Sequence, residues 1–538
     1  MNKSILAGSL LFAILATAVL ITTGAAPVTA ISCGLIIGVL AVRQTVARWF
    51  EARVPRDTVL TAEGTPRGLV ARWVEAYVNP LPRVWSTLVR LSFKGQTKDP
   101  AAMRERPAFK VETWPIVGPM PIASRTPVKN ALFNVGHTAL KSALAMPRNE
   151  SRGREPDDVH KLAERYFGKS LMQIMPPKHQ HDLSPERLYE QVTVSGFYHV
   201  RPNNDGTHSL DLQFLRDYPV RSGASLCGGE AVVDLKGGRL LRLVTPEEIA
   251  ITPDDPRFEV EALRFRSSLF QWVTIVPHSS WCHGMVAPKL FLAAYALPET
   301  HPLREFLRPF VFKVHENAGR SNVTVFGRTG VLWNVGAMTP TATQALSVRS
   351  VNSIEIRKPA QLHMPPYLRS ILEPLWDAMD ALVKGFLVEF SIDDDDPHMR
   401  AFRSFAAVNI HNDFHHLPLS CIIVYCMFTS TVAHHLWGHI FPGTTDPRYV
   451  SVYARNSRAT DKGALMTMAE PIEWTIVRVG VVLSTRREVV RLSEQLDVSV
   501  DDPRIKSLFR EFSEKIRAVV QEAPPLLELT RVATSGML

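Results

Sequence analysis

One segment of the chain, residues 418–440, carries no acidic or basic side chain until its histidines. A helix that is apolar on every side cannot lie on a surface in water, so other parts of the chain have to cover it. The segment therefore predicts a buried helix with a helical body packed around it. Its histidines, His434, His435 and His439, then need partners inside that body, and a metal ion is one partner of suitable chemistry.

The spacing of these histidines selects two of them. His435 and His439 are four residues apart, so on a regular helix they lie about 40° from one another, on the same face. A shared metal ion needs this arrangement. His434 is the neighbour most easily mistaken for His435. His411 and His415 have the same spacing, but they lie in a polar stretch and are interpreted as residues of a loop or a helix start.

A second histidine pair, His278 and His283, lies in a stretch that is poor in charge. Residues five apart on a regular α-helix point about 140° away from each other. Both could serve one ion only if the helix is widened there, as in a π-helical turn. Pro277 removes a backbone donor and Gly284 has no side chain to clash, so both tolerate such an irregularity. The alternative is that both histidines are satisfied within a core without metal.

Length and composition set broader limits. The 538 residues, 46% apolar and 21% charged, suffice for one large or two ordinary domains. The net charge of +9 is spread along the chain, which does not suggest binding to nucleic acid. The cysteines are odd in number and form no C-x-x-C pair, so we expect free thiols rather than disulfides at Cys33, Cys227, Cys282, Cys421 and Cys426.

The N-terminus is predicted to anchor the chain in a membrane. Residues 5–23 are uncharged and long enough to cross a bilayer as a helix, and a second uncharged apolar run covers residues 30–42. Basic residues flank both runs, which favours a hairpin over residues 1–48 with both ends in the cytoplasm. A signal peptide is the alternative interpretation, although it leaves the second run unexplained.

Local patterns predict the remaining elements. Residues 231–235 and 240–244 alternate as in a β-hairpin whose turn is Gly237-Gly238, within a β-rich subregion at about 192–252. Four adjacent carboxylates at 393–396 are interpreted as a solvated loop or a helix start, because neighbours in sequence do not converge on one ion. Amphipathic patterns predict helices within residues 69–77, 156–166, 376–390 and 505–520.

The spacing of several histidines resembles that of the lipoxygenases, the non-haem iron dioxygenases of polyunsaturated fatty acids. That family carries H-x4-H on a long central helix, with H-P-[IL] eighteen residues after its second histidine. His278, His283 and the run 301–303 have the same spacing. A second buried helix of the family carries H-x3-N or H-x3-H, which His435 and His439 match.

The resemblance extends to the C-terminus and covers roughly residues 192–538. The last residue of a lipoxygenase gives its carboxylate to the iron, and here that residue is Leu538. Gly319 resembles the family's alanine or glycine near the oxygen channel, while a turn glycine is the alternative. The resemblance implies one non-haem iron per chain, with ligands at His278, His283, His435, His439 and Leu538.

The resemblance also implies an overall organisation. We expect a mainly α, lipoxygenase-like catalytic domain over residues 49–538, with a small antiparallel β-sheet insertion. The N-terminal transmembrane hairpin would replace the family's β-barrel domain. The chain would be a membrane-anchored monomer with its catalytic domain in the cytoplasm.

The activity implied is abstraction of hydrogen from a bis-allylic carbon of a polyunsaturated fatty acid or related lipid, and addition of O2 to give a hydroperoxide. The same iron site could instead isomerise a hydroperoxide or oxidise a specialised biosynthetic lipid. A non-catalytic, membrane-anchored binding protein is the alternative outside the enzymes. A zinc hydrolase is disfavoured because the histidines lack an H-E-x-x-H pattern or another general-base glutamate.

Overall fold

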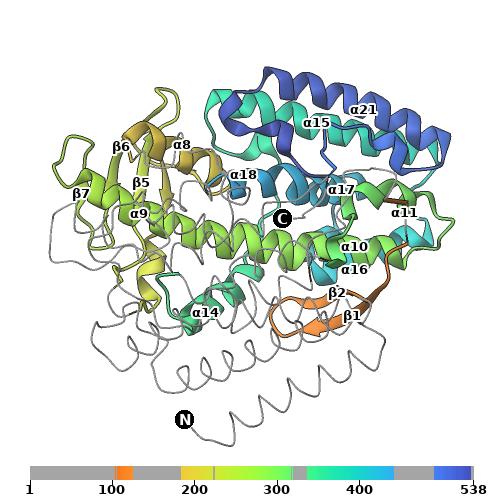
Figure 1. Cartoon of the computed structure of the whole chain (residues 1–538), viewed down its shortest axis with the longest axis horizontal. Helices are drawn as coiled ribbons and strands as arrows, with labels where there is room; N and C mark the ends of the chain where they lie inside the picture. The colour runs from red at the N-terminus through yellow and green to blue at the C-terminus, as the bar shows by residue number, and fades with distance from the viewer. Residues whose placement is uncertain are drawn as a thin grey trace, which may run out of the picture.

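The computed structural model describes residues 103, 104, 106–124, 183–221, 224–316, 318, 336–440 and 490–534. Helices predominate in these ranges (Figure 1). The predicted hairpin at 1–48 and the helices predicted within 69–77 and 156–166 lie outside the described residues, so they stay predictions.

One long helix runs through the middle of the described chain (Figure 1). It consists of α9 (Phe258–Val273), the π-helix η4 (Thr274–Val286) and α10 (Ala287–Ala296), which follow one another without a break. The predicted irregular helix around His278 and His283 is therefore confirmed. Almost every side chain of η4 is buried, so this helix lies in the core.

A second core helix has the same composite build. It joins α17 (Leu419–Phe428), the π-helix η8 (Thr429–Ala433) and α18 (His434–Gly438). Within the described ranges it is the one helix of sufficient length and hydropathy to cross a membrane, with a mean hydropathy of 1.4, and 89% of its apolar window is buried. The prediction of a buried helix is confirmed. Both η8 and α18 pack against η4.

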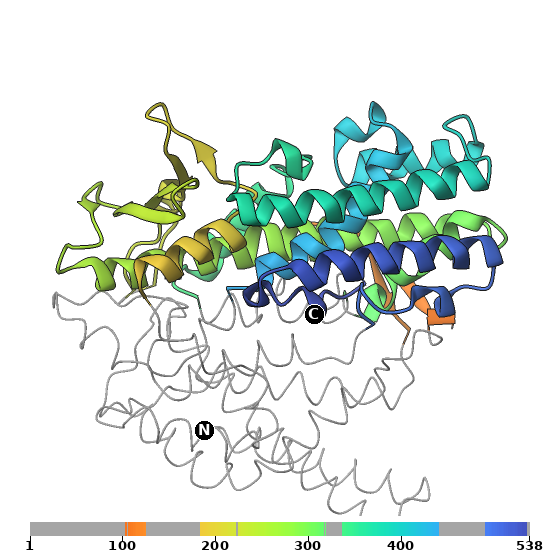
Figure 2. The same cartoon turned by 90° about the horizontal axis from the view of Figure 1, so that it is seen from above.

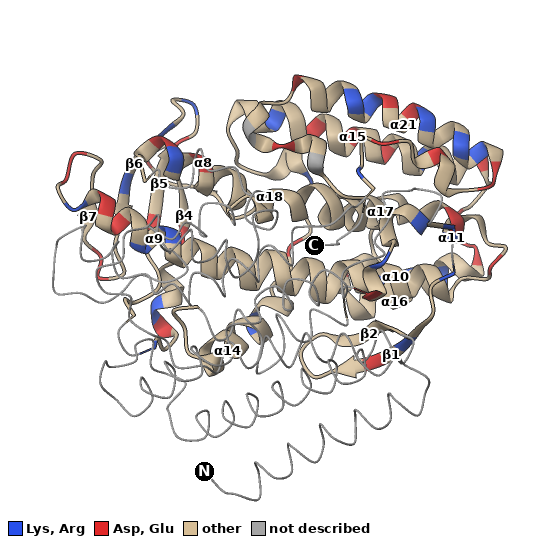
Figure 3. Ribbon diagram, viewed as in Figure 1, with Lys and Arg blue, Asp and Glu red and all other residues tan. Residues whose placement is uncertain are grey.

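Two long amphipathic helices cover these core helices. Helices α15 (Pro366–Glu389) and α21 (Pro503–Glu522) pack against each other, and α15 also packs against α17 (Figure 2). Figure 3 shows charged residues along α21. A phenylalanine of α11 (Pro302–Leu307) stacks on both helices, with the Phe306 centroid 4.1 Å from that of Phe386 on α15 and 5.5 Å from that of Phe509 on α21. The helices predicted within 376–390 and 505–520 are confirmed.

The shorter helices begin in a common way. Proline occupies the first turn of α8 (Pro185–Ser195), α11 (Pro302–Leu307), α14 (Pro340–Val351) and α16 (Pro397–Asn409), where its missing N–H costs no helical hydrogen bond. The 3₁₀ helices are η3 (Gln213–Asp217), η5 (Arg308–Val311), η6 (Pro359–Gln361), η7 (Asn412–His415), η10 (Leu496–Ser499), η11 (Pro525–Leu527) and η12 (Leu529–Arg531).

An antiparallel sheet lies at one end of the central helix (Figure 1). The predicted hairpin is confirmed, since β5 pairs with β6 and Gly238 in their turn has φ +66. The sheet has the strands, in spatial order, β3 (Arg201–Pro202), β4 (His208–Asp211), β5 (Glu230–Asp234), β6 (Arg239–Val244) and β7 (Ala250–Ile251).

A second, separate hairpin was not predicted. Its strands β1 (Phe109–Trp114) and β2 (Gly118–Ala123) pair antiparallel, and β2 packs on α10. The amine of Lys289, on α10, reaches into the turn between the strands. It donates to the Val117 carbonyl oxygen at 2.6 Å and to that of Pro119.

Candidate metal centre

Three histidines from the two core helices meet at one point. His278 and His283 come from η4, and His434 is the first residue of α18. One nitrogen atom from each ring lies within 4.8 Å of the others. The Nε2 atoms of His283 and His434 are 3.0 Å apart. The two helices thus converge on a site to which each contributes imidazole nitrogens.

The π-helix η4 explains how His278 and His283 converge. Its wider turns bring residues five apart toward the same face, which a regular α-helix cannot do. Pro277 has no N–H and so leaves the regular hydrogen-bond ladder incomplete just before His278. The Ser280 hydroxyl donates to the carbonyl oxygen of Ile275, five residues earlier, at 2.7 Å. The irregularity required by the histidine spacing is therefore built into the local sequence.

The three rings are shielded from solvent. His278 and His283 are each 3% exposed, and His434 is 8% exposed. Burial, reinforced by the neighbouring histidines, lowers the pKa of His278 and of His434 well below the usual value. At neutral pH these two rings are uncharged, which is the form that binds metal ions.

The donor set fits a metal ion. Two ligands at right angles, each about 2.1 Å from an ion, lie about 3 Å apart, which is close to the separation of His283 and His434. Imidazole nitrogen suits iron, zinc and copper. Burial raises the pKa of the adjacent Cys282 thiol, so this cysteine stays protonated and offers no thiolate. Within the described residues this is the only metal-compatible cluster of three or more side chains.

The third histidine of the cluster is His434, whereas the spacing argument selects His435. The Nε2 atom of His435 lies 2.9 Å from the carbonyl oxygen of Leu527, and that of His439 lies 3.7 Å from Glu190 Oε1. Spacing sets only the angle between His435 and His439. Which face of α18 points toward η4 depends on the packing of the two helices, and this packing brings His434 to His278 and His283.

Two predicted site residues, Leu538 and Gly319, lie outside the described residues, so their roles stay predictions. His301 of the H-P-L run is described. It caps the start of α11, where its Nδ1 accepts a hydrogen bond from the Leu303 N–H at 3.2 Å. In the tail, the Thr534 N–H donates to the Val490 carbonyl oxygen at 3.1 Å.

Several polar patterns have the structural roles predicted for them. The Asp396 side chain caps the start of α16, accepting from the His398 and Met399 N–H groups. His411 and His415 lie at the 3₁₀ helix η7. The described cysteines are all free, as expected: Cys227, Cys282, Cys421 and Cys426.

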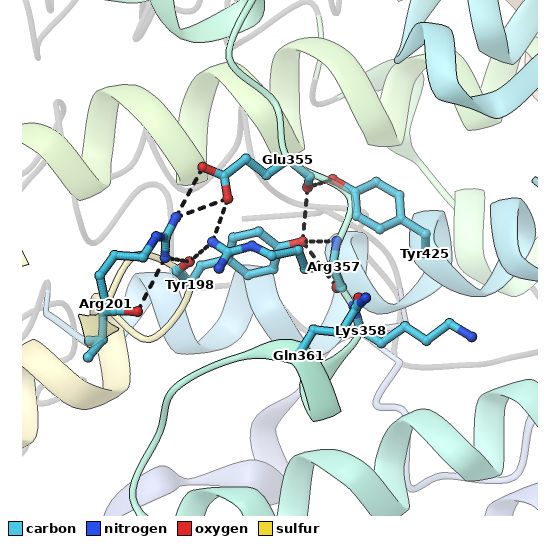
Figure 4. A network of polar contacts seen from close by, with 8 residues as sticks. Tyr198, Arg201, Glu355, Arg357, Lys358, Gln361 and Tyr425 are labelled. Carbon is cyan, nitrogen blue, oxygen red and sulfur yellow. Dashed lines mark hydrogen bonds and ion pairs between the residues drawn. The ribbon is translucent and has the colours of Figure 1, made fainter. Parts of the chain in front are cut away.

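An aromatic and polar network behind the site was not predicted. The Tyr198 ring packs edge-on against Trp281 of η4 and Trp437 of α18, at centroid distances of 5.9 Å and 6.2 Å. Its hydroxyl donates to the Glu355 carbonyl oxygen and accepts from the Arg357 N–H, both at 2.9 Å. Figure 4 shows these hydrogen bonds together with those of Arg201 and Tyr425. The network joins both histidine-bearing helices to the segment after α14.

This chain is similar to known proteins in its structure, and no similarity was found by sequence. No protein-family model matches the chain, and no curated protein does. A coral 8R-lipoxygenase has a TM-score of 0.61 at 12% identity, covering 86% of this chain and 82% of its own. A calcium-dependent 11R-lipoxygenase has a TM-score of 0.64 at 14% identity, covering 82% and 80%.

A fungal lipoxygenase from Fusarium graminearum has a TM-score of 0.56 at 12% identity, covering 75% of this chain and 90% of its own. Lipoxygenases of such different origin thus share one architecture with this chain. The chain therefore has a lipoxygenase-like fold, in agreement with the resemblance of its histidine motifs to that family.

Proposed function

We propose that the chain is an iron-dependent dioxygenase that adds O2 to a polyunsaturated fatty acid or a related lipid to give a hydroperoxide. The observation that carries this proposal is the convergence of His278, His283 and His434, from two buried helices, within a lipoxygenase-like fold. One solved relative of this fold has arachidonate bound, which supports a lipid as the substrate class.

The proposed ligands are the imidazoles of His278, His283 and His434 and the C-terminal carboxylate of Leu538. This set revises the sequence prediction by replacing His435. Starting from His434, the family's H-x3-N or H-x3-H pattern would place a further ligand at Gly438, which has no side chain. We therefore propose three imidazoles and one carboxylate as the protein's complete contribution, with His439 outside the set.

Bound iron would supply the one-electron oxidation that removes hydrogen from a bis-allylic carbon. The chain's own contribution is to present uncharged imidazoles in a region closed to bulk water. Because His278 and His434 are buried and neutral, they bind a cation without first losing a proton. Almost all residues of η4 and η8 are buried, which keeps bulk water from the site and limits competing reactions with water.

Metal content and oxygen consumption test the proposal. The full chain, purified in detergent, should contain about one iron per chain and consume O2 with arachidonate, with a conjugated diene appearing in the ultraviolet spectrum. His434→Ala should lose iron and lower kcat/KM by more than about 100-fold, since even residues that only support a metal ligand contribute about 10- to 100-fold. His415→Ala, at an exposed histidine of η7, is the matched control and should behave as the wild type.

The alternatives correspond to distinct outcomes. If the protein contains iron and does not oxidise a fatty acid, yet converts a fatty-acid hydroperoxide without consuming O2, it is an isomerase. A protein without stoichiometric metal would be a binding protein, and the dioxygenase proposal would then be wrong. The membrane anchor at residues 1–48 and the cytoplasmic location of the catalytic domain stay proposals, and membrane flotation of the full chain against a chain lacking those residues tests the anchor.

A further inference from the structure

Helix α18, which carries His434, is the last part of the composite core helix. Its five residues, His434–Gly438, continue the π-helix η8 and pack against η4. The last turn of a helix has carbonyl groups without a helical partner and is its least stable part, so contacts with other elements help to fix it. The direction in which His434 points therefore depends in part on the contacts that α18 makes.

The C-terminal tail holds α18 through His435. The Nε2 atom of His435 lies 2.9 Å from the carbonyl oxygen of Leu527. A carbonyl oxygen only accepts, so this nitrogen must carry the proton and donate. Leu527 is itself fully buried and ends the 3₁₀ helix η11.

The tail is in turn fastened to the body beyond this point. The Leu492 N–H donates to the Val532 carbonyl oxygen at 2.8 Å, and Arg491 and Ala533 form an antiparallel bridge. The tail is thus a supported segment, able to restrain the ring that donates to it.

Helix α8 holds α18 through two other contacts. The Ser195 hydroxyl donates to the Leu436 carbonyl oxygen at 3.3 Å. The Nε2 atom of His439 lies 3.7 Å from Glu190 Oε1, with the two side chains 11% and 18% exposed. Arg187 also contacts Glu190 and holds this carboxylate in place. Ligand-bearing α18 is therefore restrained by the tail and by α8.

We propose that His435 and His439 are positioning residues, which hold α18 between the tail and α8 so that His434 faces His278 and His283. This inference rests on the proposed metal centre. Supporting groups around a metal ligand fix its orientation and thereby its affinity for the ion. Here His435 and His439, rather than His434 itself, make the supporting contacts. Their effect therefore reaches His434 through the backbone of α18.

Matched substitutions of His435 test the proposal in the full chain. His435→Gln keeps a side-chain N–H that can reach the Leu527 carbonyl oxygen, whereas His435→Phe keeps a flat ring without a donor. We expect His435→Phe to weaken Co²⁺ binding by about 10- to 100-fold and to change the visible spectrum of bound Co²⁺. We expect His435→Gln to stay within about threefold of the wild type.

A second pair of variants covers the other side of α18. Glu190→Gln should weaken Co²⁺ binding, while Glu186→Gln, at an exposed position on the same helix, should not. Thermal unfolding of the metal-free proteins is measured in parallel. This pair keeps the test decisive if His435→Phe fails to fold.

The outcomes separate this proposal from the proposed function. If the wild type binds Co²⁺ and both His435→Phe and Glu190→Gln bind it equally well with unchanged spectra, the positioning role is wrong and the metal centre stands. Loss of affinity that is the same in His435→Phe and His435→Gln, and that merely follows a lower unfolding temperature, would also overturn it. If the wild type binds no metal, the proposed function fails and the inference falls with it.

Discussion

Lys289 is the most completely buried cation among the described lysines, with no exposed surface. Its Nζ atom faces the Val117 and Pro119 carbonyl oxygens and lies 3.7 Å from Met120 Sδ. Each of these acceptors is uncharged, so nothing in this set compensates the cost of burying an ammonium ion. Burial lowers the pKa of Lys289 from 10.5 to about 7.

This pKa shift predicts a pH-dependent stability. Between about pH 7 and pH 10 the unfolded chain holds a proton on Lys289 that the folded chain has largely released, so the free energy of unfolding should rise with pH. The contribution from one such group is at most about 1.4 kcal/mol per pH unit. Urea unfolding at a series of pH values measures this contribution in the wild type and in Lys289→Met. The difference between their free energies of unfolding should increase with pH by up to this amount.

The control is Lys384→Met, since the Lys384 side chain is 62% exposed and pairs with Asp380 on the surface of α15. The difference in free energy of unfolding between Lys384→Met and the wild type should not increase with pH over this range. A flat difference for Lys289→Met over the same range would show that Lys289 keeps its proton when folded, and the argument from burial would be wrong.

Among the secondary-structure elements, the π-helix η4 has the geometry that brings His278 and His283 together. Two adjacent serines of η4 illustrate how its geometry is stabilised. Both are buried, but the Ser280 hydroxyl donates to the Ile275 carbonyl oxygen at 2.7 Å, whereas the Ser279 hydroxyl has no hydrogen-bond partner within the described residues. A buried hydroxyl with a partner stabilises the fold, and one without a partner costs free energy.

The two serines should therefore respond differently to the same change. Ser280→Ala should lower the free energy of unfolding by about 1 kcal/mol, because it removes a buried hydrogen bond. Ser279→Ala should leave it unchanged or raise it. Urea unfolding of the metal-free variants measures both effects, and equal destabilisation by the two substitutions would contradict the hydrogen-bond assignment in η4.

At the scale of the whole molecule, the candidate site joins distant parts of the chain. His283 and His434 are 151 residues apart in sequence, and the proposed carboxylate belongs to the last residue. Bringing residues together that are so far apart in sequence costs conformational entropy. The packing of the core helices and of α15 and α21 has to offset this cost. The proposed metal ligands can therefore meet only when the complete tertiary structure has formed.

A short extension of the C-terminus tests whether the Leu538 carboxylate binds the metal. If the Leu538 carboxylate binds the metal, adding a few flexible residues should remove most of the iron and lower the activity by more than about 100-fold, because the carboxylate becomes an amide. An extension of equal length at the N-terminus is the control. Full iron content and activity in the C-terminally extended protein would exclude the carboxylate as a ligand.

Sequence patterns were enough to predict a buried helix within residues 418–440, an irregular helix around His278 and His283, and the β5–β6 hairpin. They also predicted a loop or helix start at residues 393–396, where Asp396 caps α16. These features follow from local rules, since hydrophobicity, residue spacing and turn chemistry act within one element. Packing between elements, which sequence patterns do not show, places His434 rather than His435 near His278 and His283. It also lets Lys289 and Tyr198 bridge separate elements. The physical reason is that spacing sets the angle between two residues of one helix, while the direction in which that helix faces depends on its packing against the rest of the chain.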